Sequence, residues 1–186
     1  MNSRATRAWG AVATMIGVAV FIIVVLILHW VQPEYEPRHQ LMSELAIGQH
    51  GWAMFVAFFG LATAVFGLQV TIAGFAGSGG LRVLLGAAAL LFLTAGIFPL
   101  GVNSHIHIGA TATAFVLSGL AMYLFPSSAG RASVAAPRAV SWSLAVGVAV
   151  SVALGDSVIP MGIAQRLATA CLLLWLGIVA WRIFRL

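Results

Sequence analysis

The longest charge-free stretch of the chain limits its fold more than any other feature. No Asp, Glu, Lys or Arg occurs from Val83 to Gly130. A helix crosses the ~30 Å hydrocarbon core of a bilayer with about 20 apolar residues, so this stretch is long enough for two spans. Pro99, Gly101 and Asn103 supply a turn between them. Over the whole chain 7% of the residues are charged, against about 25% in soluble domains, which excludes a water-soluble fold.

The same length criterion divides the whole chain into six spans. Short connections and the need to satisfy every backbone hydrogen bond in lipid then favour an antiparallel bundle. We therefore predict an all-α integral membrane protein, a six-transmembrane-helix antiparallel bundle in a single domain over 1–186. The predicted spans are 8–30, 52–76, 81–98, 106–125, 139–158 and 163–183.

The distribution of arginine predicts the orientation of the bundle. There is no Lys, and with both termini in the cytoplasm seven of the 9 basic residues lie on the cytoplasmic side, as the positive-inside rule requires. These are Arg4, Arg7, Arg82, Arg131, Arg138, Arg182 and Arg185. The acidic residues and histidines then fall on the outer side, which predicts a polar site facing outwards. They are Glu34, Glu36, Glu44, Asp156, His29, His39, His50, His105 and His107.

The first outer loop carries several of these polar residues. After Pro37 its apolar positions Leu41, Met42 and Leu45 have helical spacing, which predicts a short interfacial helix that folds onto the bundle. On such a helix His39 and Ser43 would share one face. Glu44 would lie about 140° round the helix from His39.

Two further groups of polar residues lie near the ends of spans. His105 and His107 precede or begin the fourth span, where an extended backbone would point both rings the same way. Arg166 begins the sixth span, and a charge at that depth needs a partner. We expect an ion pair of Arg166 with Glu44 or, failing that, with Asp156; the alternative is an anionic lipid head group.

Several short motifs resemble one family of bacterial membrane proteins, catalogued as domain of unknown function 998. They are Glu34-Tyr35-Glu36-Pro37-Arg38-His39, Ser43-Glu44-Leu45, Gly51-Trp52, Gly96-Ile97-Phe98-Pro99, His107 with Phe115, and Gly162 to Arg166. The resemblance implies a six-span protein of the bacterial inner membrane and directs attention to His39, Ser43, His107 and Arg166. The family often has an acidic residue after Phe-Pro, where this chain has Leu100-Gly101. A carboxylate in that role would have to come from Glu44 or Asp156.

Two functions fit these residues, and the sequence leaves open whether the protein is an enzyme. The favoured hypothesis is binding of a membrane lipid or small amphiphile at an outward-facing site. Its residues would be His39, Ser43, Glu44, His107 and Arg166. The alternative is a metal-dependent hydrolase of lipid-like substrates, with zinc on His39, His105 and His107. Its catalytic candidates are Glu44, Ser43 and Asp156.

Features that the sequence lacks exclude some partners and some types of structure. No basic cluster is interleaved with aromatic residues, so nucleic acid is not an expected partner. The single cysteine, Cys171, excludes an internal disulfide. No internal repeat of the kind found in transporters is evident. The expected partners are membrane lipids, and a protein partner is left open.

Overall fold

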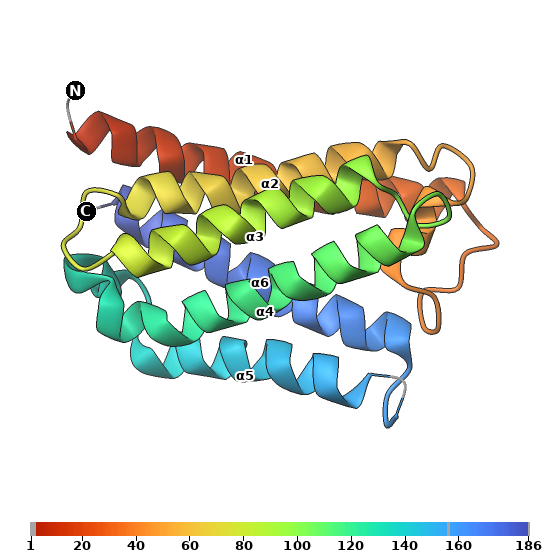
Figure 1. The fold of residues 1–186 in the computed structure, drawn as a ribbon. Helices are drawn as coiled ribbons and strands as arrows, with labels where there is room; N and C mark the ends of the chain where they lie inside the picture. Colours follow the sequence, from red (N-terminus) through yellow and green to blue (C-terminus); the bar gives the residue numbers. More distant parts are fainter. Residues whose placement is uncertain (1–2, 156, 186) are drawn as a thin grey trace.

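The computed structural model describes residues 3–155 and 157–185 of the chain, and all the regular structure in them is helical (Figure 1). These residues contain six α-helices, and two of the connections between them contain a short 3₁₀-helix; the longest connection is 32–52. The α-helices are α1 (Ser3–Val31), α2 (Ala53–Ile72), α3 (Gly79–Ile97), α4 (Ser104–Ser128), α5 (Arg138–Leu154) and α6 (Met161–Phe184). The 3₁₀-helices are η1 (Met42–Ala46) and η2 (Gly130–Ala135).

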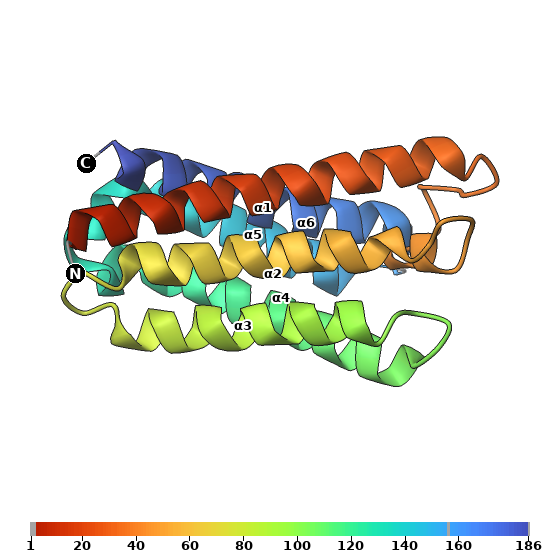
Figure 2. The same ribbon diagram turned by 90° about the horizontal axis from the view of Figure 1, so that it is seen from above.

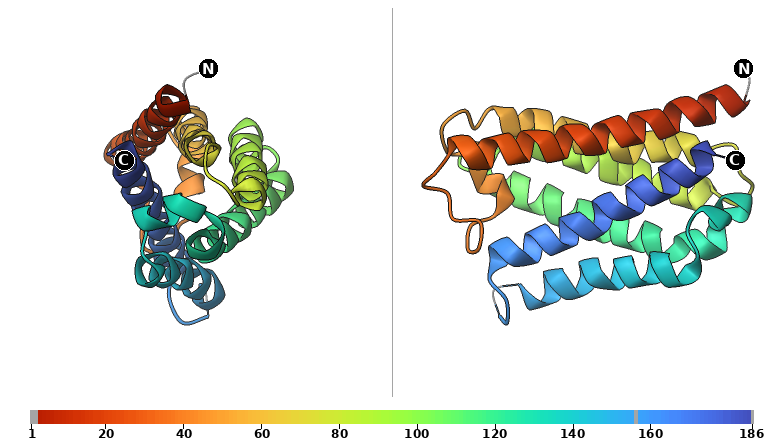
Figure 3. Two further views of the ribbon diagram at one scale, coloured as in Figure 1. Left: turned by 90° about the vertical axis from the view of Figure 1, so that its left-hand side faces the viewer. Right: turned by 180° about the vertical axis from the view of Figure 1, so that it is seen from behind.

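The six helices form an antiparallel bundle. Each helix packs against the next one in the chain, and α1 also packs against α6, which closes the arrangement into a ring (Figures 2 and 3). Both described chain ends lie at one end of the bundle, which we call the terminal end (Figure 3). The loop that contains η1 lies at the opposite end, which we call the η1 end (Figure 1).

The predicted fold is confirmed, with differences in the helix bounds. Five helices are long and apolar enough to cross a membrane, by length and composition, while α5 has 17 residues and is shorter. The predicted fifth span was too long, because the helix ends at Leu154 and not at 158. Its carbonyl accepts the N–H groups of Ser157, Val158 and Ile159 at 3.1 to 3.3 Å. The helix ends there because the next residue, Gly155, is extended (φ −58°, ψ 133°), whereas an α-helix needs a ψ of about −42°.

Small residues bring α1 and α2 into backbone contact. A Cβ atom added at Gly67 would lie 2.7 Å from the carbonyl oxygen of Gly10, and one added at Gly17 would overlap the carbonyl oxygen of Gly60. Such close approach is what small residues allow between membrane helices, where dispersion contacts replace the hydrophobic effect as the driving force. Gly60 and Gly67 are therefore the positions on α2 at which the backbone of α1 comes closest.

Candidate functional site

The first loop packs onto the η1 end of the bundle, as expected, but with a later helix start. Residues 37–40 form a turn, Leu41 is extended (φ −63°, ψ 144°), and η1 begins only at Met42. The side chains of Met42 and Leu45 are buried against the bundle. The prediction that His39 and Ser43 share a helix face was therefore wrong. His39 is exposed, whereas Ser43 is 2% exposed.

Glu44 is used within the loop itself. Its carboxylate accepts the backbone N–H of Leu41 at 2.9 Å and the side-chain amide of Gln40 at 3.3 Å. A carboxylate that accepts an N–H group at the first turn of a helix stabilises the start of that helix. Glu44 thus holds the extended residue Leu41 at the beginning of η1.

Arg166 does not form the ion pair expected with Glu44. Its guanidinium donates to the carbonyl oxygens of Gln40 (3.1 Å) and Gly162 (2.8 Å). It also donates to the Tyr35 hydroxyl (2.6 Å) and the His29 ring (3.0 Å). A side chain that does lie near a carboxylate is His39, whose Nε2 is 3.8 Å from Glu36 Oε1. Asp156, the other expected partner, lies outside the described residues.

The hydrogen bonds around Arg166 show which atoms of His29 and Tyr35 carry a proton. His29 Nδ1 lies 2.6 Å from the carbonyl oxygen of Val25 and so donates to it, which leaves Nε2 to accept from the guanidinium. The Tyr35 hydroxyl donates to the carbonyl oxygen of Leu41 at 2.8 Å. Burial raises the pKa of Tyr35 above its ordinary value, although Arg166 acts in the opposite direction. Tyr35 is therefore a neutral donor, and Arg166 connects α1, the first loop and α6.

His107 is buried inside the bundle near the η1 end. The side chain is 2% exposed, and its ring meets Phe58 edge to face at 5.2 Å between centroids. Nδ1 lies 2.8 Å from the carbonyl oxygen of Ala95 and 3.2 Å from that of Phe98. Because carbonyls only accept, Nδ1 carries the proton. Nε2 is buried and has no hydrogen-bond partner among the described residues.

A cavity of about 390 Å³ lies beside His107, between α4, α5, α6 and the start of η1. Its polar lining consists of Ser43, His107, Thr111, Ser151 and Gln165, and the rest is apolar. Ile108, Val116 and Val152 line the cavity and are exposed on the surface of the bundle. The cavity therefore opens on the flank of the bundle between α4 and α5.

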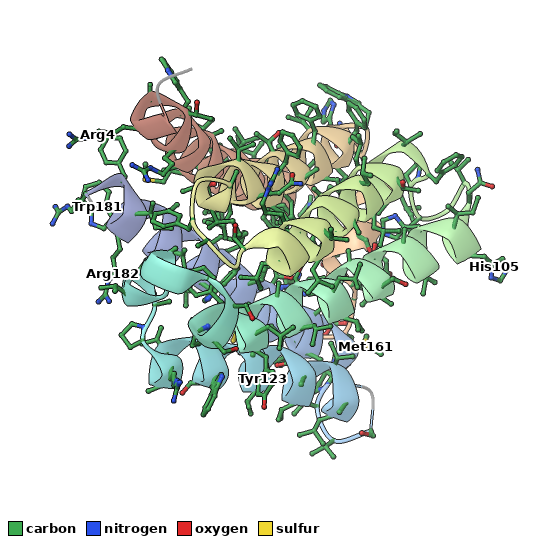
Figure 4. The ribbon with its side chains drawn as sticks, turned by 60° about the vertical axis from the view of Figure 1, so that its left-hand side comes forward. Arg4, His105, Tyr123, Met161, Trp181 and Arg182 are labelled. Atoms are coloured by element: carbon green, nitrogen blue, oxygen red, sulfur yellow. The ribbon has the colours of Figure 1, made fainter. Side chains whose placement is uncertain are left out.

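An apolar groove of about 510 Å³ lies next to this cavity, between α4 and α5. The cavity and the groove share Phe115, Val116 and Val152, so the two spaces adjoin. Figure 4 labels Met161, which lines the cavity, and Tyr123, which lines the far part of the groove. The Tyr123 ring stacks on Trp142, with 5.7 Å between the two centroids. The combined space is polar at one end and apolar along the rest of its length. We call it the α4–α5 site.

Of the residues predicted for the site, the structure brings Ser43 and His107 together in this cavity. Glu44 and Arg166 stabilise the neighbouring loop, and His39 is exposed. His105 is exposed at the η1 end, where its side chain points away from the bundle (Figure 4). No group of three His, Cys, Asp or Glu side chains that could hold a metal ion occurs in residues 3–155 and 157–185. The expected set of His39, His105 and His107 is thus not assembled there.

Three residues of the cavity were missed by the sequence analysis: Thr111, Ser151 and Gln165. Thr111 lies four residues after His107 on α4, a spacing that places both side chains on one helix face. That spacing could have identified Thr111. Gln165 accepts the backbone N–H of Met42 at 2.6 Å, a contact across 123 residues that no local pattern indicates.

Comparison with known proteins agrees with the resemblance seen in the motifs. Neither the curated proteins nor the solved structures contain a significant match to the chain. The model of the family described as "Protein of unknown function (DUF998)" matches residues 15–182, from the first helix to the last and across the whole α4–α5 site. The chain therefore belongs to the DUF998 family.

Proposed function

We propose that the protein binds a membrane lipid or another small amphiphile in the α4–α5 site. The observation that supports this is two adjoining spaces, a cavity with Ser43 and His107 in its lining and an apolar groove between α4 and α5. Ligand sites in proteins are mostly apolar concavities with a few polar groups that fix orientation. An amphiphile matches this pattern, with its head group in the cavity and its chain in the groove.

The opening on the flank of the bundle supports the same proposal. Exposed apolar side chains border the cavity and the groove on the lipid-facing surface, among them Val116, Val146 and Val152. A ligand that already resides in the bilayer can enter without exposing its chain to water, so the hydrophobic cost of entry is small. A water-soluble ligand would meet an almost wholly apolar opening.

Filling the groove should weaken binding of the ligand through its hydrocarbon chain. Gly119 lines the groove on α4, and a Cβ added there would make only ordinary contact with Val148, at 3.8 Å. We expect Gly119→Phe to fold but to lose at least ~10-fold in affinity for a photoreactive C18 fatty alcohol, because the ring occupies chain volume. Crosslinking of that probe in nanodiscs measures the affinity.

The matched control is Gly109→Phe, on the same helix but outside the groove, where a Cβ would have no neighbour within 4 Å. This variant should crosslink like the wild type. Equal labelling of both variants, or labelling that maps away from α4 and α5, would disprove the proposed function.

We further propose that the protein lies in the bacterial inner membrane with both termini in the cytoplasm. The support is the arginine bias toward the terminal end, as Figure 4 illustrates with Arg4 and Arg182. In a Cys171→Ser background, a membrane-impermeant maleimide added to spheroplasts should label His105→Cys and not Val134→Cys. Both positions are exposed, one at each end of the bundle. The opposite labelling pattern would reverse the orientation.

A further inference from the structure

We propose that the head group bound in the α4–α5 site is uncharged and carries a hydroxyl, as in fatty and isoprenoid alcohols or acylglycerols. This inference rests on the proposed function and specifies the class of ligand. The hydroxyl donates a hydrogen bond to Nε2 of His107 and accepts one from Thr111.

The requirement for a donor comes from the proton assignment on His107. With Nδ1–H directed at the carbonyl oxygens of Ala95 and Phe98, the neutral ring presents a lone pair at Nε2. That atom is buried, and it has no partner in the described part of the chain. A buried polar atom without a hydrogen bond carries an unrelieved desolvation cost. A ligand O–H directed at Nε2 removes this cost, whereas an ether or ester oxygen cannot.

The requirement for an acceptor comes from Thr111. Several other helical threonines donate to the carbonyl four residues back: Thr14 to Gly10, Thr71 to Gly67, and Thr169 to Gln165, each at 2.8 to 3.0 Å. Thr111 is 8% exposed, and its hydroxyl oxygen is buried with no hydrogen-bond partner among the described residues. The hydroxyl is thus available to a ligand. Because it lies on the same helix face as His107, one ligand oxygen can meet both side chains.

The absence of charge in the lining disfavours an ionic head group. None of the described residues that line the cavity is Asp, Glu or Arg. Two charged residues expected at the site have other partners: Glu44 caps η1, and Arg166 holds Tyr35 and His29. A buried phosphate, carboxylate or ammonium group would lose its hydration without a countercharge, which is far more costly than burying a hydroxyl.

Four probes that share one C18 chain test the head group. We expect oleyl alcohol to bind at least ~10-fold more tightly than oleyl methyl ether, which lacks the donor, because an unmet buried acceptor disfavours the ether. Oleyl sulfate and oleyltrimethylammonium should bind more weakly still. Affinities are measured in phosphatidylcholine nanodiscs by displacement of the photoreactive fatty alcohol.

The outcomes separate this inference from the proposed function. Equal affinity for the alcohol and the ether, or a preference for either charged probe, overturns the hydroxyl head group and leaves the site itself intact. Failure of all four probes to displace the label overturns the proposed function, and this inference with it.

A pair of variants on α4 distinguishes a ligand-binding hydroxyl from a structural one. We expect Thr111→Val to weaken binding of oleyl alcohol about 5-fold, the usual effect of one hydrogen bond. The thermal midpoint of the ligand-free protein should not fall, since no protein hydrogen bond is lost. Ser118→Ala is the matched control, because its buried hydroxyl also lacks a partner among the described residues but does not line the site. It should leave binding unchanged. Unaltered binding by Thr111→Val would refute the inference.

Discussion

Replacement of Gly17 by Leu is expected to prevent α1 from packing against α2 and to cost the bundle most of its stability. A Cβ added at Gly17 would overlap the carbonyl oxygen of Gly60 and lie 2.6 Å from the backbone nitrogen of Ala64. Both are backbone atoms of a neighbouring helix, so no side chain can rotate to make room. We expect a loss of more than about 4 kcal/mol, the range reached only by severe substitutions. Denaturation in mixed micelles, followed by tryptophan fluorescence, measures it.

The matched control for this effect is Gly177→Leu on α6, where a Cβ would have no neighbour within 4 Å. The two variants share the same change in side-chain volume and in helix propensity. The control should therefore stay within about 0.5 kcal/mol of the wild type or gain stability from removal of a mid-helix glycine. If both variants unfold at the same denaturant concentration, the close contact between α1 and α2 is not the source of the effect.

Replacement of Arg166 by Met is expected to release the first loop from the bundle. The substitution removes donors from four acceptors at once, on α1, the loop and α6. Hydrogen bonds of charged donors contribute about 1.5–3 kcal/mol each to stability. Because Arg166 is partly exposed and solvent screens its charge, the four bonds together contribute less than the sum of these values. We expect a loss of about 3 kcal/mol and rapid proteolysis between Pro33 and Gly51. Arg166→Lys should recover only part of it, since an ammonium group cannot reproduce the planar fork.

Two double-mutant cycles identify the partner of Arg166. Tyr35→Phe and Arg166→Met should be non-additive by about 1 kcal/mol or more, because the hydroxyl and the guanidinium are in direct contact. Glu44→Gln and Arg166→Met should be additive, because the carboxylate is bonded to Leu41 and Gln40. A large coupling in the second cycle, with none in the first, would restore the ion pair that the sequence suggested.

The helical fold could be predicted from the sequence because it depends on the length and charge content of each segment, which can be read from the residues alone. A charge-free run long enough to cross a bilayer has few structural options, and the run from Val83 to Gly130 became α3 and α4 as expected. Errors were confined to helix ends such as Leu154, where individual carbonyl bonds decide the boundary.

The candidate site was predicted only in part, because its composition depends on contacts between distant segments. Ser43 and His107 were both indicated by the resemblance to the family motifs, and they do line one cavity. The partner of Arg166 was not predictable in the same way. Charge alone favours a carboxylate, but Gln40, Tyr35 and His29 supply neutral acceptors through the path of the loop. Glu44, by contrast, forms a local hydrogen bond: its carboxylate accepts the backbone N–H of Leu41 and is not paired with Arg166.

The flank opening between α4 and α5 determines which concentration would set the occupancy of the proposed ligand. A ligand that enters through exposed Val116 and Val152 arrives by diffusion within the bilayer. Occupancy then follows the mole fraction of ligand among the lipids, not its amount per volume of buffer. Adding inert phosphatidylcholine at constant total ligand should therefore empty the site by surface dilution. Diluting the whole suspension with buffer should leave occupancy unchanged, because a ligand that stays in the bilayer keeps its mole fraction among the lipids.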